Sequence, residues 1–274
     1  MAKQIKFVTR ADDAGSSHSA NAAIVKVIGA GLIKNVSVMA PGSFVEEAAQ
    51  MMKARKEVCF GMHATLNAEW DRVKWGPVSE LPPGSGLTDE NGMFLADPRM
   101  FLETKPPLEL VMREYDAQLD KLCRTGFPIR YVDSHMFPEM AIEGLDEAVA
   151  DWAKRKGLLD HMYYYALPPG WEVILKDMKK ALPFLLSMPA GQYFIVAHPA
   201  LDTEEMRMTG NAGVSGEKVA KDRNMETMIY GSPVTKHVMR AIGIRPLRYD
   251  EATPQKRLTA ADVIQLLNQA ELEG

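Results

Sequence analysis

Acidic and histidine residues end several short apolar runs of this sequence. Asp12 and Asp13 close the first run, and His63, His135 and His198 close or directly follow three later ones. Two neutral imidazoles and one carboxylate suit a divalent metal ion and leave positions open for water and substrate. A metal ion held in this way lowers the pKa of bound water and polarises a carbonyl or phosphoryl oxygen. The pattern therefore predicts metal-assisted hydrolysis.

The adjacent carboxylates constrain the backbone. Neighbouring side chains of a strand point to opposite faces, so Asp12 and Asp13 converge on one site only where the chain leaves strand geometry. An unpaired carboxylate inside a core is also costly. We therefore expect the first strand to become a loop at this pair, with Gly15 allowing a turn and a helix beginning near Ser17.

General chemistry suggests roles for the other polar residues. A carboxylate close to the metal ion, but not bound to it, can take a proton from water as a general base, and His198 can protonate the leaving atom. Asp133 lies two residues before His135, where it either orients a metal ligand or caps a loop. Residue types alone leave open which member of the acidic pair binds the ion.

Strand-like runs alternate with helical patterns through most of the chain. About six or seven strands, each followed by a helix, indicate a mainly parallel sheet with right-handed crossovers, and over this length they suggest a barrel; an open doubly wound sheet is the alternative. In either fold the carboxyl ends of the strands share one face, which would bring the polar residues together. The expected strands are 5–10, 35–40, 57–65, 131–137, 161–167, 192–199 and 246–249. The first expected helix begins near Ser17, and the later ones are 44–55, 107–125, 144–156, about 172–187, 217–230, 232–242 and 259–272.

Two long segments rich in Pro and Gly interrupt this alternation. Residues 66–106 form the first insertion and residues 199–215 the second, and loops of this length are more often functional than accidental. The second is a candidate lid, although an ordinary surface loop fits its glycines equally well. Trp70, Trp75 and Trp171 either present ring faces to a substrate or pack against their own loops. We expect one domain, residues 1–274.

Composition narrows the class of protein. The chain has 46% hydrophobic and 25% charged residues and a formal net charge of −4, without a basic run that would follow a phosphate backbone, so we expect no nucleic-acid partner. No stretch approaches the ~18 apolar residues that span a bilayer, and the sequence starts without an apolar leader, so we expect no membrane partner and a cytoplasmic protein. Cys59 and Cys123 are expected to be reduced thiols.

Four motifs in order resemble the YdjC family, the carbohydrate deacetylases of the chitooligosaccharide deacetylase type. They are "TRADDAG", "GMHATLN", "VDSHMFP" and "AHPA", and the later "KDRNMETMIYGSPVTKHVMRAIGIRPLRY" is similar to the closing Arg-x-x-Glu segment of that family. The resemblance implies a distorted (β/α) barrel with mainly parallel strands and long loop insertions. It also implies one divalent metal ion, Mg²⁺ or Zn²⁺, and removal of acetyl groups from N-acetylated sugars.

The resemblance assigns roles by motif. It implies that Asp13, His63 and His135 are the metal ligands and that Asp12 is the general base. It also implies that His198 is the general acid and that Arg10 orients Asp12.

The sequence departs from the family at three positions. The family often has an aromatic residue at the position of Ala14 and a glycine at the position of Ala200. It also often has a further histidine after "DSH", where this chain continues with Met136. The implied metal ligands remain, so the departures bear on substrate specificity more than on metal binding. The implied partner is a small N-acetylated sugar, with its length, its phosphorylation and a homodimeric state left open.

Two other functions stay open. A metal-dependent phosphohydrolase or phospho-acceptor protein is one, because receiver domains also begin with a strand that ends in Asp-Asp; it would leave the histidines unexplained. A non-catalytic metal- and sugar-binding regulatory protein is the other, but it has no need for Asp12 and His198. Among the remaining histidines, His18 is expected to face solvent at a helix start, and His161 and His237 have no acidic motif near them.

Overall fold

Parallel strands form the centre of the computed structural model, which describes residues 4–171 and 180–272. The strand order is β5-β4-β3-β2-β1-β6, with β7 also paired to β1, and every ladder is parallel. Over the described residues the strands are β1 (Ile5–Ala14), β2 (Asn35–Val38), β3 (Cys59–Ala64), β4 (Ile129–Ser134), β5 (Leu159–Asp160), β6 (Gly191–Ala197) and β7 (Ile244–Leu247).

The sheet curls into a half-barrel. Strand β6 pairs with residues 5–11 of β1 along one edge. The other edge of β1 is therefore shared by β7, which pairs with residues 5–8, and β2, which pairs with residues 10–14. The two end strands, β5 and β6, form no ladder with each other in the described part of the chain. The backbone N–H of Phe194 in β6 nevertheless donates to the carbonyl of Ala166, six residues beyond β5, at 2.6 Å. The predicted α/β class with a distorted barrel of mainly parallel strands is confirmed.

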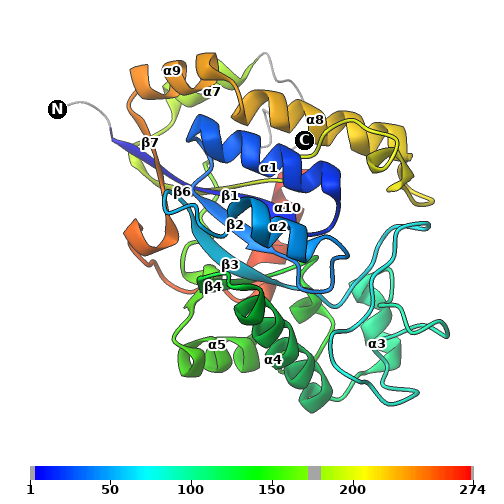
Figure 1. Cartoon of the computed structure of the whole chain (residues 1–274). Helices are drawn as coiled ribbons and strands as arrows, with labels where there is room; N and C mark the ends of the chain where they lie inside the picture. Colours follow the sequence, from blue (N-terminus) through cyan, green and yellow to red (C-terminus); the bar gives the residue numbers. More distant parts are fainter. Residues whose placement is uncertain (1–3, 172–179, 273–274) are drawn as a thin grey trace.

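Helices surround the curled sheet (Figure 1). Buried residues of several of these helices join strand residues in the largest hydrophobic cluster, which includes Ile24, Val36, Phe60 and Leu122. The helices are α1 (His18–Ala30), α2 (Val45–Met52), α3 (Phe101–Thr104), α4 (Leu108–Thr125), α5 (Leu145–Lys156), α7 (Ala181–Ser187), α8 (Gly216–Tyr230), α9 (Pro233–Ala241) and α10 (Ala260–Leu272), with short 3₁₀ turns at Pro98–Met100, Pro138–Met140, His161–Tyr163, Met206–Met208 and Tyr249–Glu251.

The first strand bends where the acidic pair lies. Asp13 has a φ of 66°, in the left-handed region, and the pairing of β1 with β2 shifts register between Ala11 and Ala14. Asp is one of the few residue types that adopt this conformation readily. The chain then turns into α1, whose first turn is capped by Ser17 Oγ accepting from the N–H of Ala20. The predicted bend at the acidic pair is therefore present, but the strand does not become a loop there, because β1 continues through both residues to Ala14.

One predicted strand is wrong. Residues 161–167 do not form a strand, because β5 ends at Asp160 and the Asp160 carboxylate accepts from the N–H of Met162, which starts a 3₁₀ turn. The apolar and aromatic run that follows looks like a strand in sequence but is half-buried irregular structure. The predicted helix 172–187 begins outside the described residues, and α7 covers its final part.

The two insertions are packed structures that touch each other. Trp75, Leu87 and Phe94 of the first insertion are buried in the main hydrophobic cluster. The N–H of Asp71 in the first insertion donates to the carbonyl of Gly210 in the second at 2.8 Å. They form one wall beside the carboxyl ends of the strands, which we call the insertion wall (residues 66–106 and 199–215).

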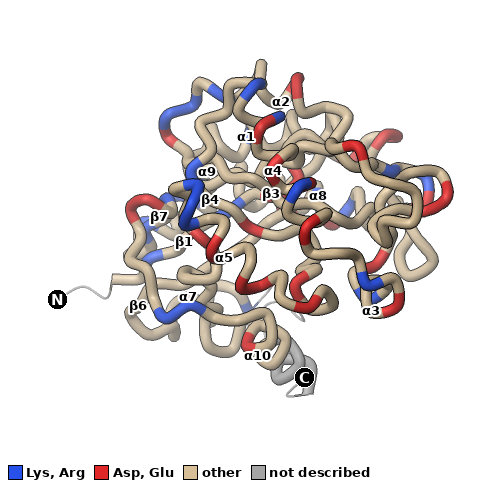
Figure 2. The backbone as a smooth tube through the Cα atoms, turned by 90° about the horizontal axis from the view of Figure 1, so that it is seen from below, with Lys and Arg blue, Asp and Glu red and all other residues tan. Residues whose placement is uncertain are grey.

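Charged residues are spread over the surface elements. Figure 2 shows acidic and basic positions interspersed along the described chain. Between residues 4 and 171 and between 180 and 272, no helix has both the length and the apolar character needed to cross a bilayer.

We expect Gly61→Ala to destabilise the protein by about 1–3 kcal/mol. A Cβ at Gly61 in β3 would lie 2.2 Å from the ring of Tyr131, which is fully buried and hydrogen-bonded through its hydroxyl to Ser37. Gly29→Ala in α1 is the matched control, because a Cβ at Gly29 would meet nothing within 4 Å. Since Ala favours a helix over Gly, this variant should stabilise the protein by up to about 1 kcal/mol. Urea unfolding of both variants would test this, and equal stabilities would contradict it.

Candidate metal centre

Three predicted metal ligands meet at the carboxyl ends of their strands. Asp13 lies at the bend of β1, His63 in β3, and His135 one residue beyond β4. Asp13 Oδ1 lies 3.5 Å from His63 Nε2 and 3.6 Å from His135 Nδ1, and the two ring nitrogens are 3.1 Å apart. Ligands about 2.0–2.2 Å from one tetrahedral ion are themselves roughly 3.4 Å apart. The triangle therefore has the dimensions of a metal-ligand set.

A second observation supports a cation at this point. Asp13 Oδ1 is buried and has no hydrogen-bond partner, which is costly for a carboxylate oxygen. The ring nitrogens of His63 and His135 that face each other can both be satisfied by an ion that accepts their lone pairs. These residues fit a divalent cation.

A second group of potential ligands fits less well. Asp12, His63 and Asp133 also bring one donor atom each within 4.8 Å of one another. However, Arg10 binds both oxygens of Asp12, and Asp133 Oδ2 is already shared by His63 Nδ1 and Arg10 Nη2. The triangle of Asp13, His63 and His135 remains the better candidate.

Asp133 orients His63. Its Oδ2 lies 2.8 Å from His63 Nδ1, so Nε2 of the same ring faces the triangle. A carboxylate in this position fixes the ring of a metal-binding histidine. The contact agrees with the first of the two roles predicted for Asp133, orientation of a ligand. Burial opposes the charged ring, but the carboxylates of Asp133 and Asp12 outweigh it and raise the pKa of His63 to about 10.

Arg10 holds Asp12 by two bonds. Its Nε and Nη2 lie 2.6 and 2.7 Å from Asp12 Oδ1 and Oδ2, and its guanidinium stacks 4.8 Å from the ring centre of Phe194. Burial opposes the charge, but Asp12 and Asp133 outweigh it and hold the pKa of Arg10 well above its ordinary value. The expected contact between Arg10 and Asp12 is present.

His198 lies on the β6 side of β1, whereas His63 and His135 lie on the β2 side. It directly follows β6, and its backbone N–H donates to Glu226 Oε2. Burial would raise the pKa of Asp13, but Arg223 first, and then the three histidines, hold it well below its usual range. All six predicted site residues therefore lie at one end of the sheet.

Sequence reasoning missed three charged residues. Arg223 Nη1 of α8 lies 2.7 Å from Asp13 Oδ2, Glu69 Oε2 of the first insertion lies 3.0 Å from His135 Nε2, and Glu226 accepts from His198. Arg223 and Glu226 are the Arg and Glu of the late Arg-x-x-Glu segment, so that motif carried a usable signal. For Glu69 the only signal in the sequence was its position six residues after His63.

His161 was wrongly set aside. It is buried, and its Nδ1 lies 3.3 Å from Arg10 Nη1. Burial and the Arg10 charge lower the pKa of His161 to about 4, although Asp133 and Asp160 act in the opposite direction. His18, in contrast, is exposed, as expected, and it also forms an ion pair with Glu47.

The tryptophans divide between site and loop. The buried ring of Trp75 lies 6.0 Å from the ring of His135, and its Nε1 donates to the carbonyl of Asn67. Trp70 is half-buried, with the Arg223 guanidinium 5.7 Å from its ring centre. Trp171 donates its backbone N–H to Pro168 in a turn. The first insertion therefore brings two aromatic rings to the site.

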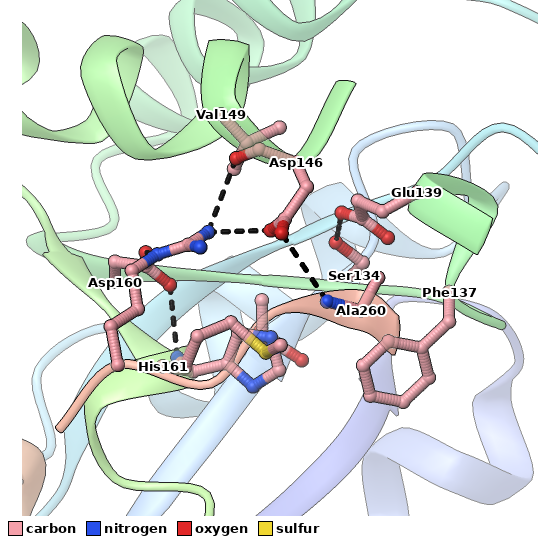
Figure 3. A pocket seen from close by; sticks show the side chains of 11 residues that line it. Ser134, Phe137, Glu139, Asp146, Val149, Asp160, His161 and Ala260 are labelled. Carbon is pink, nitrogen blue, oxygen red and sulfur yellow. Dashed lines mark hydrogen bonds and ion pairs between the residues drawn. The ribbon is translucent and has the colours of Figure 1, made fainter. Parts of the chain in front are cut away.

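A small cavity lies behind the site (Figure 3). Its volume of about 10 Å³ is close to what one water molecule needs. Glu139 and Asp133, which both line it, each have one buried oxygen without a partner. Ser134 Oγ donates to the other oxygen of Glu139, and burial raises the pKa of Glu139 to about 7.

The comparisons with known proteins concern the family and the fold. The fold is a parallel α/β half-barrel with a candidate carboxylate–histidine metal site, and the family of YdjC-like proteins matches residues 6–170. The chain belongs to the YdjC-like family. Among curated relatives, a carbohydrate deacetylase of Vibrio cholerae is 27% identical over 131 residues, 48% of each chain, and a chitooligosaccharide deacetylase of Enterobacter sp. is 29% identical over 153 residues, 56% of this chain and 57% of the relative.

These matches cover about half the length of the curated relatives. A solved protein of Enterococcus faecalis V583, named for cellobiose-phosphate cleavage, superimposes with a TM-score of 0.68 at 19% identity over 90% of this chain and 98% of its own. At that identity the likeness concerns the fold.

We expect Glu139→Gln to change how stability depends on pH. The folded state keeps the Glu139 proton up to about pH 7, whereas the ordinary pKa is 4.5, so the wild type loses stability as pH rises between these values. Gln keeps an acceptor for Ser134 but carries no charge. The variant should gain up to about 3 kcal/mol relative to wild type between pH 4 and 8. Denaturant unfolding across this range would measure the difference, and a constant difference would contradict it.

Proposed function

We propose that this chain is a metal-dependent hydrolase that removes acetyl groups from N-acetylated sugars. The observation that carries the proposal is the triangle of Asp13, His63 and His135 with its unpartnered Asp13 oxygen. Support comes from the names of the family relatives, which are carbohydrate and chitooligosaccharide deacetylases.

Asp13, His63 and His135 would hold the ion. Two nitrogen donors and one carboxylate favour Zn²⁺ over Mg²⁺, which prefers an all-oxygen set. The bound ion supplies Lewis acidity toward the acetamide carbonyl and lowers the pKa of water.

Asp12 is the proposed general base. Each carboxylate oxygen has two lone pairs, so the two bonds from Arg10 leave an acceptor position on each oxygen. The fork of Arg10 fixes the plane of the carboxylate, which holds the acceptor in one direction. Asp12 takes the proton of the attacking water while the new C–O bond forms.

His198 is the proposed general acid. It approaches from β6, across β1 from the two histidine ligands, which suits a group that acts on the leaving side of the acetamide. As the C–N bond breaks, the amine nitrogen needs a proton, and the His198 ring donates it. The products are acetate and the free amino sugar.

We also propose that residues 1–274 form a single deacetylase domain. Strand β1 pairs with β6 and β7, so the beginning of the chain and its later part share one sheet.

Zinc should stabilise the folded protein through Asp13. At about 100 times the dissociation constant, binding adds about 2.7 kcal/mol, which corresponds to a rise in Tm on the order of 5 °C. Asp13→Asn should lose this rise, because a neutral amide binds the ion poorly, whereas Asp222→Asn on the exposed face of α8 should keep it. Thermal unfolding of metal-stripped protein with and without Zn²⁺ measures the effect. An unchanged rise in Asp13→Asn would rule out this ligand set.

Acetate release should depend on both the metal ion and Asp12. We expect zinc-loaded protein to release acetate from N-acetylated mono- or disaccharides, assayed with and without a 6-phosphate, and Asp12→Asn to lower kcat by about 10²–10⁴-fold while retaining zinc. Asp222→Asn is again the control. Absence of acetate from every sugar, in folded and zinc-loaded protein, would refute the deacetylase proposal and favour a binding protein or another amide substrate.

A further inference from the structure

Glu69 contacts the proposed metal centre from the insertion wall. Its side chain is 11% exposed, and its Oε2 lies 3.0 Å from His135 Nε2. The other nitrogen of that ring, Nδ1, is the atom that faces Asp13 and His63. Glu69 therefore lies behind the ring and outside the ligand triangle.

The contact selects one state of the ring. A neutral imidazole has one N–H and one lone pair, and a carboxylate beside Nε2 accepts the N–H there. The lone pair is then on Nδ1, where an ion would need it. His63 is arranged the opposite way, with Asp133 beside Nδ1 and Nε2 facing the triangle. Each histidine thus has its own orienting carboxylate.

The two orienting carboxylates have different supports. Asp133 belongs to β4 and is also bound by Arg10. Glu69 belongs to a loop, and its carbonyl accepts from Asn211 Nδ2 of the second insertion at 3.2 Å. The next residues strengthen this junction, because Asp71 N–H donates to the Gly210 carbonyl. The position of Glu69 therefore depends on both insertions.

The same wall acts on a second ligand of the triangle. Trp70 follows Glu69 and lies beside the guanidinium of Arg223. Like Val214 of the second insertion, it packs against a hydrophobic cluster that includes Met206. Arg223 in turn binds Asp13 Oδ2. The wall thus contacts His135 directly and is linked to Asp13 through Arg223 of α8.

We infer that Glu69 is a positioning residue for His135, and that the junction of the two insertions sets how tightly the site binds its metal ion. The inference rests on the metal centre of the proposed function. It implies that a change confined to the wall weakens metal binding without removing a ligand.

Zinc affinity of the full-length chain, measured by competition with a chromophoric chelator, tests the inference. Loss of an orienting carboxylate typically weakens metal binding 10–100-fold, so we expect that loss in Glu69→Ala and a smaller loss in Glu69→Gln, whose amide oxygen can still accept from Nε2. Asn211→Ala should weaken zinc binding a few-fold. Glu90→Ala, at an exposed position of the same insertion, is the matched control and should bind as wild type.

A spectroscopic measurement separates positioning from general destabilisation. In ¹⁵N-histidine-labelled protein, two-bond ¹⁵N–¹H correlation spectra should show His135 with its proton on Nε2 in the wild type and in Glu90→Ala. In Glu69→Ala the ring should sample both tautomers.

The possible outcomes distinguish the two proposals. Absence of zinc binding by the wild type would refute the metal centre itself. Zinc binding by the wild type with equal affinity in Glu69→Gln and Asn211→Ala, and an unchanged His135 tautomer, would refute the role of Glu69 alone. These two variants keep the test decisive even where Glu69→Ala fails to fold.

Discussion

The bend of β1 at Asp13 is the constraint on which the site depends. In a regular strand Asp12 and Asp13 would point to opposite faces, and only one of them could reach the histidines. The left-handed conformation of Asp13 and the register shift beside it direct one carboxylate to Arg10 and the other to the triangle. Strand β2 pairs with β1 at Ala11 and at Ala14, on either side of Asp13, so the sheet holds this bend in place.

The site also requires a balance of buried charge. Asp12, Asp13 and Asp133 are each at most 3% exposed, and isolated carboxylates at that burial would be strongly disfavoured. Arg10 compensates Asp12 and Asp133, and Arg223 binds Oδ2 of Asp13, so Asp13 Oδ1 faces His63 and His135 without a hydrogen-bond partner. The arginines therefore keep the acids in place and leave one oxygen available to a cation.

The sheet and the insertions contribute different parts of the site. The sheet supplies the proposed ligands and Arg10, and these lie within the matched residues 6–170 together with Glu69. His198, Arg223 and Glu226 lie beyond that stretch, on β6's carboxyl end and on α8. The proposed metal chemistry and the proposed proton donor thus come from separate parts of the chain, which the pairing of β1 with β6 brings together.

The sequence by itself determined the alternating α/β architecture, the strand ends that carry the acids and histidines, and the bend at Asp13, because these follow from local periodicity and from the cost of burying a carboxylate. It did not determine the roles of Glu69, Arg223 and His161. Arg223, on α8, meets Asp13 across 210 residues, and Glu69, in an insertion without periodic pattern, meets His135 across 66. His161 was missed because its apolar and aromatic neighbours resemble a strand, whereas the Asp160 cap ends β5 and turns the ring toward Arg10. Such contacts depend on how distant loops and helices pack against the sheet, and only the tertiary structure decides that.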